Sequence, residues 1–259
     1  MKFWKGFAIA ASATLLAACN GEINIDSSSS GVPLAELDYE GATPTGISLA
    51  GPDRVIVTSG ESLTIDVEGD PDVVELLRFD LDDDDLEIGR EGSWRQKGIA
   101  TIRITMPTPT SLSLAGSGEI EVDRLGTGGE AEVSIDGSGE SRVGRIDADT
   151  LEVNVAGSGS LTGAGSVQTL ELSIAGSGDI DLREVQVGKA EVSIAGSGDA
   201  IFASDGEVEA NIMGSGDVEV IGNARCSVSS MGSGDVKCRK AARAESSQGG
   251  GQAAAQEAE

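Results

Sequence analysis

The chain has 259 residues, with 18 Lys and Arg against 44 Asp and Glu, so its formal net charge at pH 7 is −26. It contains no histidine, which excludes a Ser-His-Asp triad, a Cys-His nucleophile and a histidine zinc site. The acidity excludes attraction to nucleic acid by charge, and the apolar content of 39% is enough for a folded core.

Residues 1–18 have the pattern of an export signal. A basic start precedes an apolar run from Phe7 to Leu16, which is shorter than the roughly 20 residues that a membrane-spanning helix needs. The four residues Leu-Ala-Ala-Cys that end at Cys19 resemble the lipoprotein box of bacteria, in which the cysteine is acylated. We therefore expect Cys19 to anchor the protein in a membrane, and Asn20 to favour the outer membrane. An ordinary signal peptide that ends near a cysteine is the alternative.

The next segments differ from each other in composition. Residues 19–32 include four consecutive serines and a glycine, which is typical of a flexible tether. Residues 33–110 hold all six prolines and several short β-like runs, so we expect a β-rich cap over the open edge of the segment that begins at residue 111. Within the cap, residues 80–85 begin like an EF-hand loop, but Asp85 stands where that loop needs glycine. We interpret these residues as a solvated turn.

Residues 111–240 are a repeat. Gly-Ser-Gly occurs at 116–118, 137–139, 157–159, 176–178, 196–198, 214–216 and 232–234, at intervals of 18 to 21 residues. Apolar and polar residues alternate around each copy, which indicates strands with one buried face. We predict an all-β fold, a single-stranded β-solenoid (right-handed β-helix) of about seven coils. An antiparallel β-sandwich with Gly-Ser-Gly hairpins is the alternative.

We expect the glycines of these motifs to be structural. Glycine permits positive φ, and it has no Cβ to collide with the same turn of the next coil, about 4.8 Å away. The serines have no base beside them, so we interpret them as turn residues rather than nucleophiles. The predicted turn glycines are Gly116, Gly118, Gly137, Gly139, Gly157, Gly159, Gly176, Gly178, Gly196, Gly198, Gly214, Gly216, Gly232 and Gly234.

An acidic residue follows six of the seven turns, and Ser160 follows the other. In a solenoid these residues would form a ladder along one edge, where calcium could offset their repulsion. The simpler interpretation is a solvated edge that opposes association between sheets, so we predict no metal site and keep calcium as the second hypothesis. The acidic positions are Glu119, Glu140, Asp179, Asp199, Asp217 and Asp235.

The C-terminal region contains two cysteines and a polar tail. Cys226 and Cys238 lie six residues to either side of Gly232, and the cell envelope is oxidising, so we expect a disulfide. Two buried thiols are the alternative. Residues 241–259 are rich in Ala, Gln, Gly and Glu, which predicts a disordered tail, with a frayed helix over 252–259 as the alternative.

Serial Gly-Ser-Gly-Asp/Glu follows Gly69-Asp70, Leu86-Glu87-Ile88 and Ile104-Thr105-Met106-Pro107 in this chain. This order resembles the head GIN domain family, the adhesin heads of bacterial envelope proteins, over roughly residues 35–238. The resemblance implies a β-helical fold outside the cytoplasm, and it carries over no catalytic residue.

We therefore predict a non-enzymatic binding or adhesion module of the cell envelope, held in the outer membrane by its lipidated N-terminus. Its expected partner is an envelope or extracellular protein or glycan, with no nucleic acid and no cofactor. The alternative function is a periplasm-facing structural or envelope-regulatory lipoprotein. A β-helical carbohydrate-active enzyme is the third hypothesis. Abundant acidic residues would suit it, but no long loop builds the cleft that such an enzyme needs.

Overall fold

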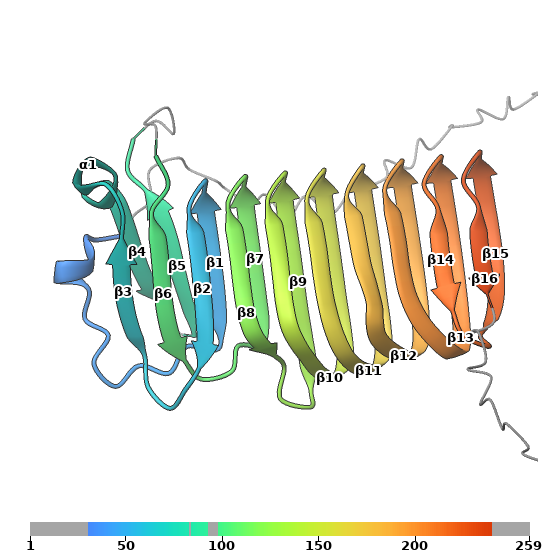
Figure 1. Cartoon of the computed structure of the whole chain (residues 1–259), viewed down its shortest axis with the longest axis horizontal. Coiled ribbons are helices and arrows are strands. Elements are labelled where there is room, and N and C mark those ends of the chain that lie inside the picture. Colours follow the sequence, from blue (N-terminus) through green and yellow to red (C-terminus); the bar gives the residue numbers. More distant parts are fainter. Residues whose placement is uncertain (1–30, 83, 93–97, 240–259) are drawn as a thin grey trace, which may run out of the picture.

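The computed structural model describes residues 31–82, 84–92 and 98–239. Its strands form a β-solenoid of about six turns, which confirms the predicted fold class and is close to the predicted number of coils (Figure 1). Most strand pairs are parallel, because each coil stacks on the one before it in the same direction. This pairing excludes the antiparallel sandwich.

The Gly-Ser-Gly part of the chain supplies ten strands. Register advances by one repeat from coil to coil, so that Gly157 pairs with Gly176 and Gly176 with Gly196. Four of the strands are long because they continue around the corner of the coil and contribute to both of its walls. The strands are β7 (Ser111–Gly116), β8 (Glu119–Leu125), β9 (Glu130–Gly137), β10 (Glu140–Gly157), β11 (Ser160–Gly176), β12 (Asp179–Gly196), β13 (Asp199–Gly214), β14 (Val218–Ile221), β15 (Arg225–Gly232) and β16 (Val236–Arg239).

The stack continues into the region that precedes the repeats. β1 (Gly46–Gly51) pairs in parallel with β7, and β2 (Arg54–Ser59) pairs in parallel with β8. β5 (Asp85–Arg90) and β6 (Thr101–Met106) pair with the other edges of β1 and β2. The first strands of the chain therefore lie between two pairs of later strands, and the boundary drawn at residue 110 divides strands of one stack.

Short elements cover the N-terminal end of the solenoid. β3 (Thr64–Glu68) pairs antiparallel with β6, and β4 (Leu77–Asp82) pairs antiparallel with β5. The 3-10 helix η1 (Leu34–Glu36) and helix α1 (Pro71–Val74) lie at the same end (Figure 1). Proline at the first position of α1 and the side chain of Asp70, which accepts a hydrogen bond from the Asp72 N–H at 3.0 Å, start this helix.

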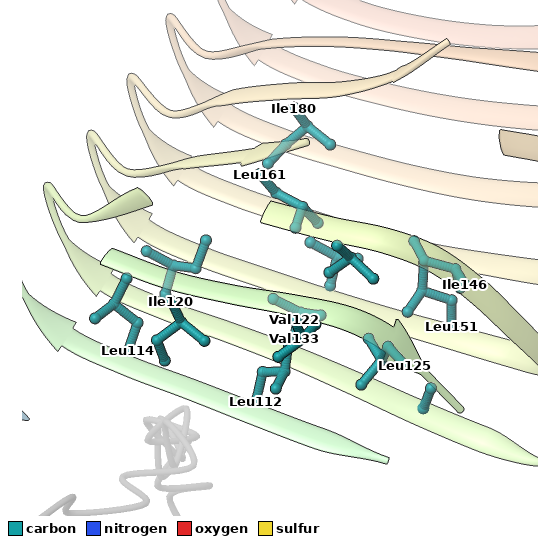
Figure 2. Close-up of a cluster of buried hydrophobic side chains, with 14 of the residues drawn as sticks. Leu112, Leu114, Ile120, Val122, Leu125, Val133, Ile146, Leu151, Leu161 and Ile180 are labelled. Carbon is teal, nitrogen blue, oxygen red and sulfur yellow. The ribbon is translucent and has the colours of Figure 1, made fainter. Parts of the chain in front are cut away.

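The core is a column of aliphatic side chains between the two walls of each coil. The alternation seen in the sequence places every second residue inward, and register then stacks these residues on their equivalents. One such row contains Ile135, Val155, Ile174, Ile194 and Ile212, all of them buried. Figure 2 shows side chains of β7 and β8 pointing into the interior between these strands.

Candidate functional site

The two glycines of each turn have different structural roles. The first has a positive φ, which ranges from 117° at Gly157 to 141° at Gly196 and which side chains rarely permit. The second does not have positive φ, but a Cβ on Gly178 would lie 2.6 Å from Val155 Cγ1 and 2.8 Å from the carbonyl oxygen of Gly159. Successive turns therefore stack too closely for a side chain at either position.

The residues that follow the turns stack along one edge of the solenoid, as the repeat predicts. We call this set the turn-side acid row. Backbone pairing connects its first members, and hydrogen bonds connect its last members. The row consists of Glu119, Glu140, Ser160, Asp179, Asp199, Asp217 and Asp235.

Hydrogen-bond donors of the protein itself bind the carboxylates at the C-terminal end of this row. Asp199 accepts a hydrogen bond from the backbone N–H of Asp217 at 2.7 Å. Asp217 accepts one from the backbone N–H of Asp235 at 2.9 Å and one from Lys237 Nζ at 3.1 Å. The backbone hydrogen bond, followed by that of the lysine, lowers the pKa of Asp217 below its ordinary value of 3.8.

Arginines neutralise the N-terminal members of the row. Arg142 forms ion pairs with Glu119 and Glu140. Arg54 pairs with Glu121 at 2.9 Å and with Glu119 at 3.5 Å, and the hydrogen bond to Glu121 raises the pKa of Arg54. Within residues 31–82, 84–92 and 98–239, no three acidic or cysteine side chains are grouped so as to hold a metal ion. The row is thus a ladder whose charges are partly satisfied by protein donors.

Arg54 belongs to a turn that the sequence analysis missed. Gly51-Pro52-Asp53-Arg54 occupies the position that Gly-Ser-Gly and its acid occupy in later coils, since Gly51 pairs with Gly116 and Arg54 with Glu119. The signal was the repeated tetrapeptide Ser-Leu-Ala-Gly, which ends at Gly51 and again at Gly116. This turn lacks the Gly-Ser-Gly sequence, so that motif alone does not identify it.

A second acidic row lies on the outer face of the strands that precede the turns, and we call it the glutamate row. Its five members pair with one another from coil to coil, and all are exposed. Ser111 and Ser227 occupy the same position at its two ends. Each glutamate stands five residues before the first glycine of a turn, a regularity that was readable in the sequence. The members are Glu132, Glu152, Glu171, Glu191 and Glu209.

Small side chains flank the glutamate row on the side toward the turns, and together these rows form what we call the outer face. Two residues further along each strand, the stacked side chains are only serine and asparagine, from Ser113 to Ser229. The next row toward the turn is mostly alanine and ends in Met213 and Met231. The outer face therefore repeats along the axis, carries a shallow groove beside Glu132, Glu152 and Glu171, and is free of aromatic rings in these rows.

Two shallow grooves run beside the corners of the solenoid. One follows the turn-side acid row and includes Asp181, Arg183 and Lys237. Arg183 donates a hydrogen bond to Asp181 at 2.7 Å, and this bond lowers the pKa of the carboxyl group. The other groove is lined by carboxylates and amides, among them Asp149 and Gln168, together with glycines and small apolar residues such as Val167. Such linings offer hydrogen bonds and charge to a bound partner.

The remaining sequence predictions fall at the ends of the chain and in the N-terminal region. Cys226 and Cys238 form a disulfide, with Cα atoms 6.8 Å apart. Cys19, residues 1–18 and residues 241–259 lie outside the described part of the chain. Residues 80–82 belong to β4 and Asp85 begins β5, and these strands pair antiparallel, so among the described residues of the predicted turn only Asp84 lies in a turn. The described helices are short, and none has the length and apolar character needed to cross a bilayer.

Comparison with known proteins identifies the family from the sequence and finds the same fold in solved structures. Residues 43–224 match the model of the family described as "Putative auto-transporter adhesin, head GIN domain". Among curated proteins, the search found no match. Several solved structures share the fold.

Three of these structures come from Bacteroides and Parabacteroides species. A "putative adhesin" from Bacteroides fragilis is 21% identical, with a TM-score of 0.67, over 75% of this chain and 92% of its own. A "putative lipid binding protein" from Parabacteroides distasonis is 23% identical, with a TM-score of 0.57, over 76% and 93%. A "putative adhesin" from Parabacteroides merdae is 19% identical, with a TM-score of 0.57, over 76% and 92%.

Proposed function

The chain belongs to the head GIN domain family, and from this membership we propose that it is a non-enzymatic adhesion module of the cell envelope. The observation that carries the proposal is the outer face, on which the same polar side chains recur in register over successive coils. A repeated face engages an extended partner through many equal contacts, so that weak individual contacts add to useful affinity.

The chemistry of the outer face favours a basic protein partner. Its five glutamates are stacked about 4.8 Å apart, and no ion pair joins them to another described residue in the way that Arg142 joins Glu119 and Glu140. Charge complementarity speeds encounter with a cationic surface and fixes its register. Sugar binding by stacking needs aromatic rings, which these rows lack.

We propose further that acylated Cys19 anchors the module in the outer membrane. The support is the lipoprotein-like segment that ends at this cysteine. Replacing Cys19→Ser should move the protein from the membrane fraction to the soluble envelope fraction. Retention of the variant in the membrane would contradict the anchor and leave the binding face untouched.

The adhesion role requires the outer face to be accessible from outside the cell. Biotinylation of intact cells, with lysed cells as control, should label the protein before lysis. Protection until lysis would contradict adhesion and support the periplasm-facing structural or regulatory role instead.

Binding by the outer face is tested with two variants of equal charge change. E152Q/E171Q/E191Q removes the centre of the glutamate row, and E36Q/E61Q/E75Q removes three exposed glutamates of the N-terminal region. Immobilised cationic, anionic and neutral proteins and neutral glycans serve as probes for the purified chain. We expect the first variant to lose binding to the cationic protein and the second to retain it. Equal loss in both would indicate attraction by net charge alone and contradict the assignment to this face.

A further inference from the structure

The C-terminal end of the solenoid is built differently from the coils before it. Among the described residues, four large hydrophobic side chains are strongly exposed, and three of them belong to the last two coils. Met213 is 61% exposed, Val228 is 49% exposed and Met231 is 75% exposed. No described element lies beyond β15 and β16, in contrast to the N-terminal end with its antiparallel strands and helices (Figure 1).

The last coil consists of β15 and β16. The inward positions of its strand β15 lack the aliphatic packing of β13, the neighbouring strand. In β13 the inward residues Val208, Ala210 and Ile212 are at most 2% exposed. The residues of β15 that stand in register with them are Cys226, Val228 and Ser230. A cysteine, a half-exposed valine and a serine thus replace three buried aliphatic residues, so hydrophobic burial holds this coil only weakly.

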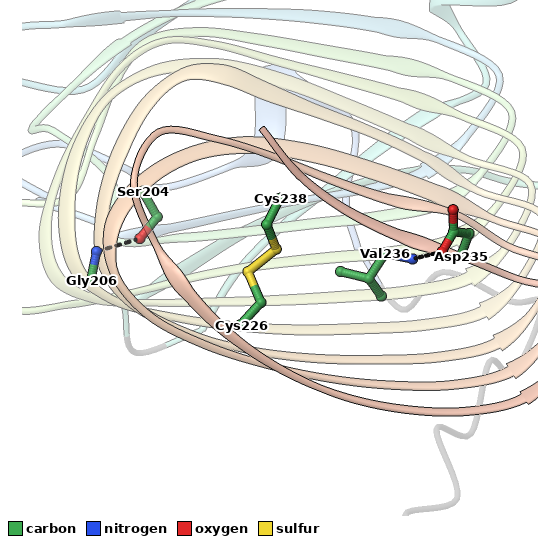
Figure 3. Close-up of a disulfide and its surroundings, with 6 residues drawn as sticks. All are labelled: Ser204, Gly206, Cys226, Asp235, Val236 and Cys238. Atoms are coloured by element: carbon green, nitrogen blue, oxygen red, sulfur yellow. Dashed lines mark hydrogen bonds between the residues drawn. A yellow bond between two sulfur atoms is a disulfide. The ribbon is translucent and has the colours of Figure 1, made fainter. Parts of the chain in front are cut away.

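The disulfide lies in the interior of the last coil, where the aliphatic packing is missing. Cys226 continues the row of Val208, and Cys238 of β16 continues the row of Val220. The bond therefore crosses the interior of the coil and joins its two walls (Figure 3). Cys238 is exposed and Cys226 is partly buried, so solvent reaches the bond from the open end.

We propose that the Cys226–Cys238 disulfide is a redox-sensitive clasp that keeps the last coil folded on the end of the solenoid. A dithiol reductant opens it: a thiolate attacks one sulfur, the other leaves as a thiolate, and the second thiol of the reductant releases the mixed disulfide. Two electrons pass to the protein, which gains two thiols, and the reductant becomes a disulfide. Exposure of Cys238 gives the reductant access that a buried structural disulfide denies.

Opening the clasp releases β15 and β16 and uncovers the edges of β13 and β14. The remaining links of the coil to its neighbour are the backbone ladders of β15 on β13 and of β16 on β14, whose groups water can also hydrogen-bond, and exposed ion pairs. The ion pairs join Arg225 to Glu207 and Lys237 to Asp217, each at 3.1 Å, and such pairs contribute little. The uncovered edges carry free backbone groups above a complete aliphatic core, which is the kind of edge that accepts an added strand.

The test is hydrogen exchange, read by mass spectrometry, on the full chain with and without dithiothreitol. We expect protection of residues 225–239 to fall by about thirtyfold or more on reduction, as loss of a loop-closing disulfide of ordinary strength implies. Protection of β11 and β12 should stay unchanged. Unchanged protection of 225–239 despite free thiols would overturn the proposal, and an equal fall in β11 and β12 would overturn it too, since the bond would then support the whole solenoid.

Variants separate the clasp from other effects of the reductant. C226S/C238S should show the unprotected end without reductant and no further response to it. Cys19→Ser removes the remaining cysteine of the chain and should respond as the natural protein does. A C226S/C238S protein with a protected last coil would contradict the proposal, and the reductant experiment on the unaltered chain decides the matter if this variant folds poorly.

Discussion

At the scale of single residues, one buried ion pair links the first coil to the strand that stacks on it. Asp53 and Arg90 are 1% and 3% exposed, and Arg90 Nε donates to Asp53 Oδ2 at 2.6 Å. Asp53 also accepts the backbone N–H of Ala100 at 2.7 Å, and Arg90 donates to the carbonyl of Gly98 at 3.0 Å. The pair therefore holds three segments of the N-terminal region together.

Removing one partner of this pair should be strongly destabilising. In Arg90→Met, Asp53 keeps a buried charge without its cation, and we expect the free energy of unfolding to fall by about 3–5 kcal/mol. Urea denaturation followed by circular dichroism measures the change. Arg103→Met is the control, because Arg103 pairs with Glu68 at 3.5 Å on the surface and should change stability by less than about 1 kcal/mol. Equal losses would show that the Asp53 pair has no special role.

Asp217 gives a pH dependence whose sign follows from its hydrogen bonds. Its native pKa lies below 3.8, so in the interval between the two values the unfolded state binds more protons, and stability rises with pH. The contribution is complete above the unfolded value and is lost as the pH falls through the native one. An NMR titration of the Asp217 carboxyl should give a pKa below 3.8. Because the N–H of Asp235 is the larger cause, Lys237→Met should raise this pKa only in part, and a full return to 3.8 would contradict that order.

At the scale of the element, the repeating unit is a turn that depends on its neighbours. The first glycine of each turn contacts the same glycine of the preceding coil, as Gly176 does with Gly157. A single turn of this shape is not stable in isolation, because its close packing requires the next turn. Repeated spacing in the sequence is therefore direct evidence for the stack.

Alanine at a turn glycine should cost far more than alanine at an unpacked glycine. At Gly176, φ is +137° and a Cβ would collide with the backbone of Gly157, so we expect Gly176→Ala to lower stability by about 2–4 kcal/mol. Gly129 has no atom within 4 Å of such a Cβ and no positive φ. Gly129→Ala should be neutral or slightly stabilising, and urea denaturation followed by circular dichroism measures both variants. Similar effects at both positions would contradict the stacking argument.

Elements that obey the repeat were predictable, and those that leave it were not. The seven Gly-Ser-Gly motifs predicted the turns, and the alternation of apolar and polar residues around them predicted which side chains point inward. The turn at Gly51 was hidden because Pro52 and Asp53 replace serine and glycine. The position of β5 beside β1 could not be read either, since sequence order says nothing about which face of a coil a later strand will cover.

At the scale of the whole molecule, the solenoid is a one-dimensional stack in which each coil contacts mainly its neighbours. Gly176 and Gly196 occupy equivalent positions in successive coils. Cutting the chain after each of them removes one complete coil and leaves the two new neighbours in register. The outer face keeps its rows of paired residues after such a change.

Deletion of residues 177–196 should therefore give a folded, shorter molecule. We expect the β signal in circular dichroism to persist and the long dimension in small-angle X-ray scattering to fall by about 4.8 Å. Deletion of residues 177–186 is the control, because it removes half a coil, so that the turns that follow no longer stack in register on those before the cut. Collapse of the first variant together with the second would show that the coils are not interchangeable.

The placement of β1 and β2 between two pairs of later strands has a consequence for biogenesis. A polypeptide leaves the ribosome with its N-terminus first, so residues 46–59 emerge before either of their neighbours. One flank closes when residues 85–106 arrive, and the other closes when residues 111–125 arrive. Until then this first coil exposes two unpaired edges. The protein therefore needs protection by a holding chaperone most while the chain between residues 59 and 125 is emerging.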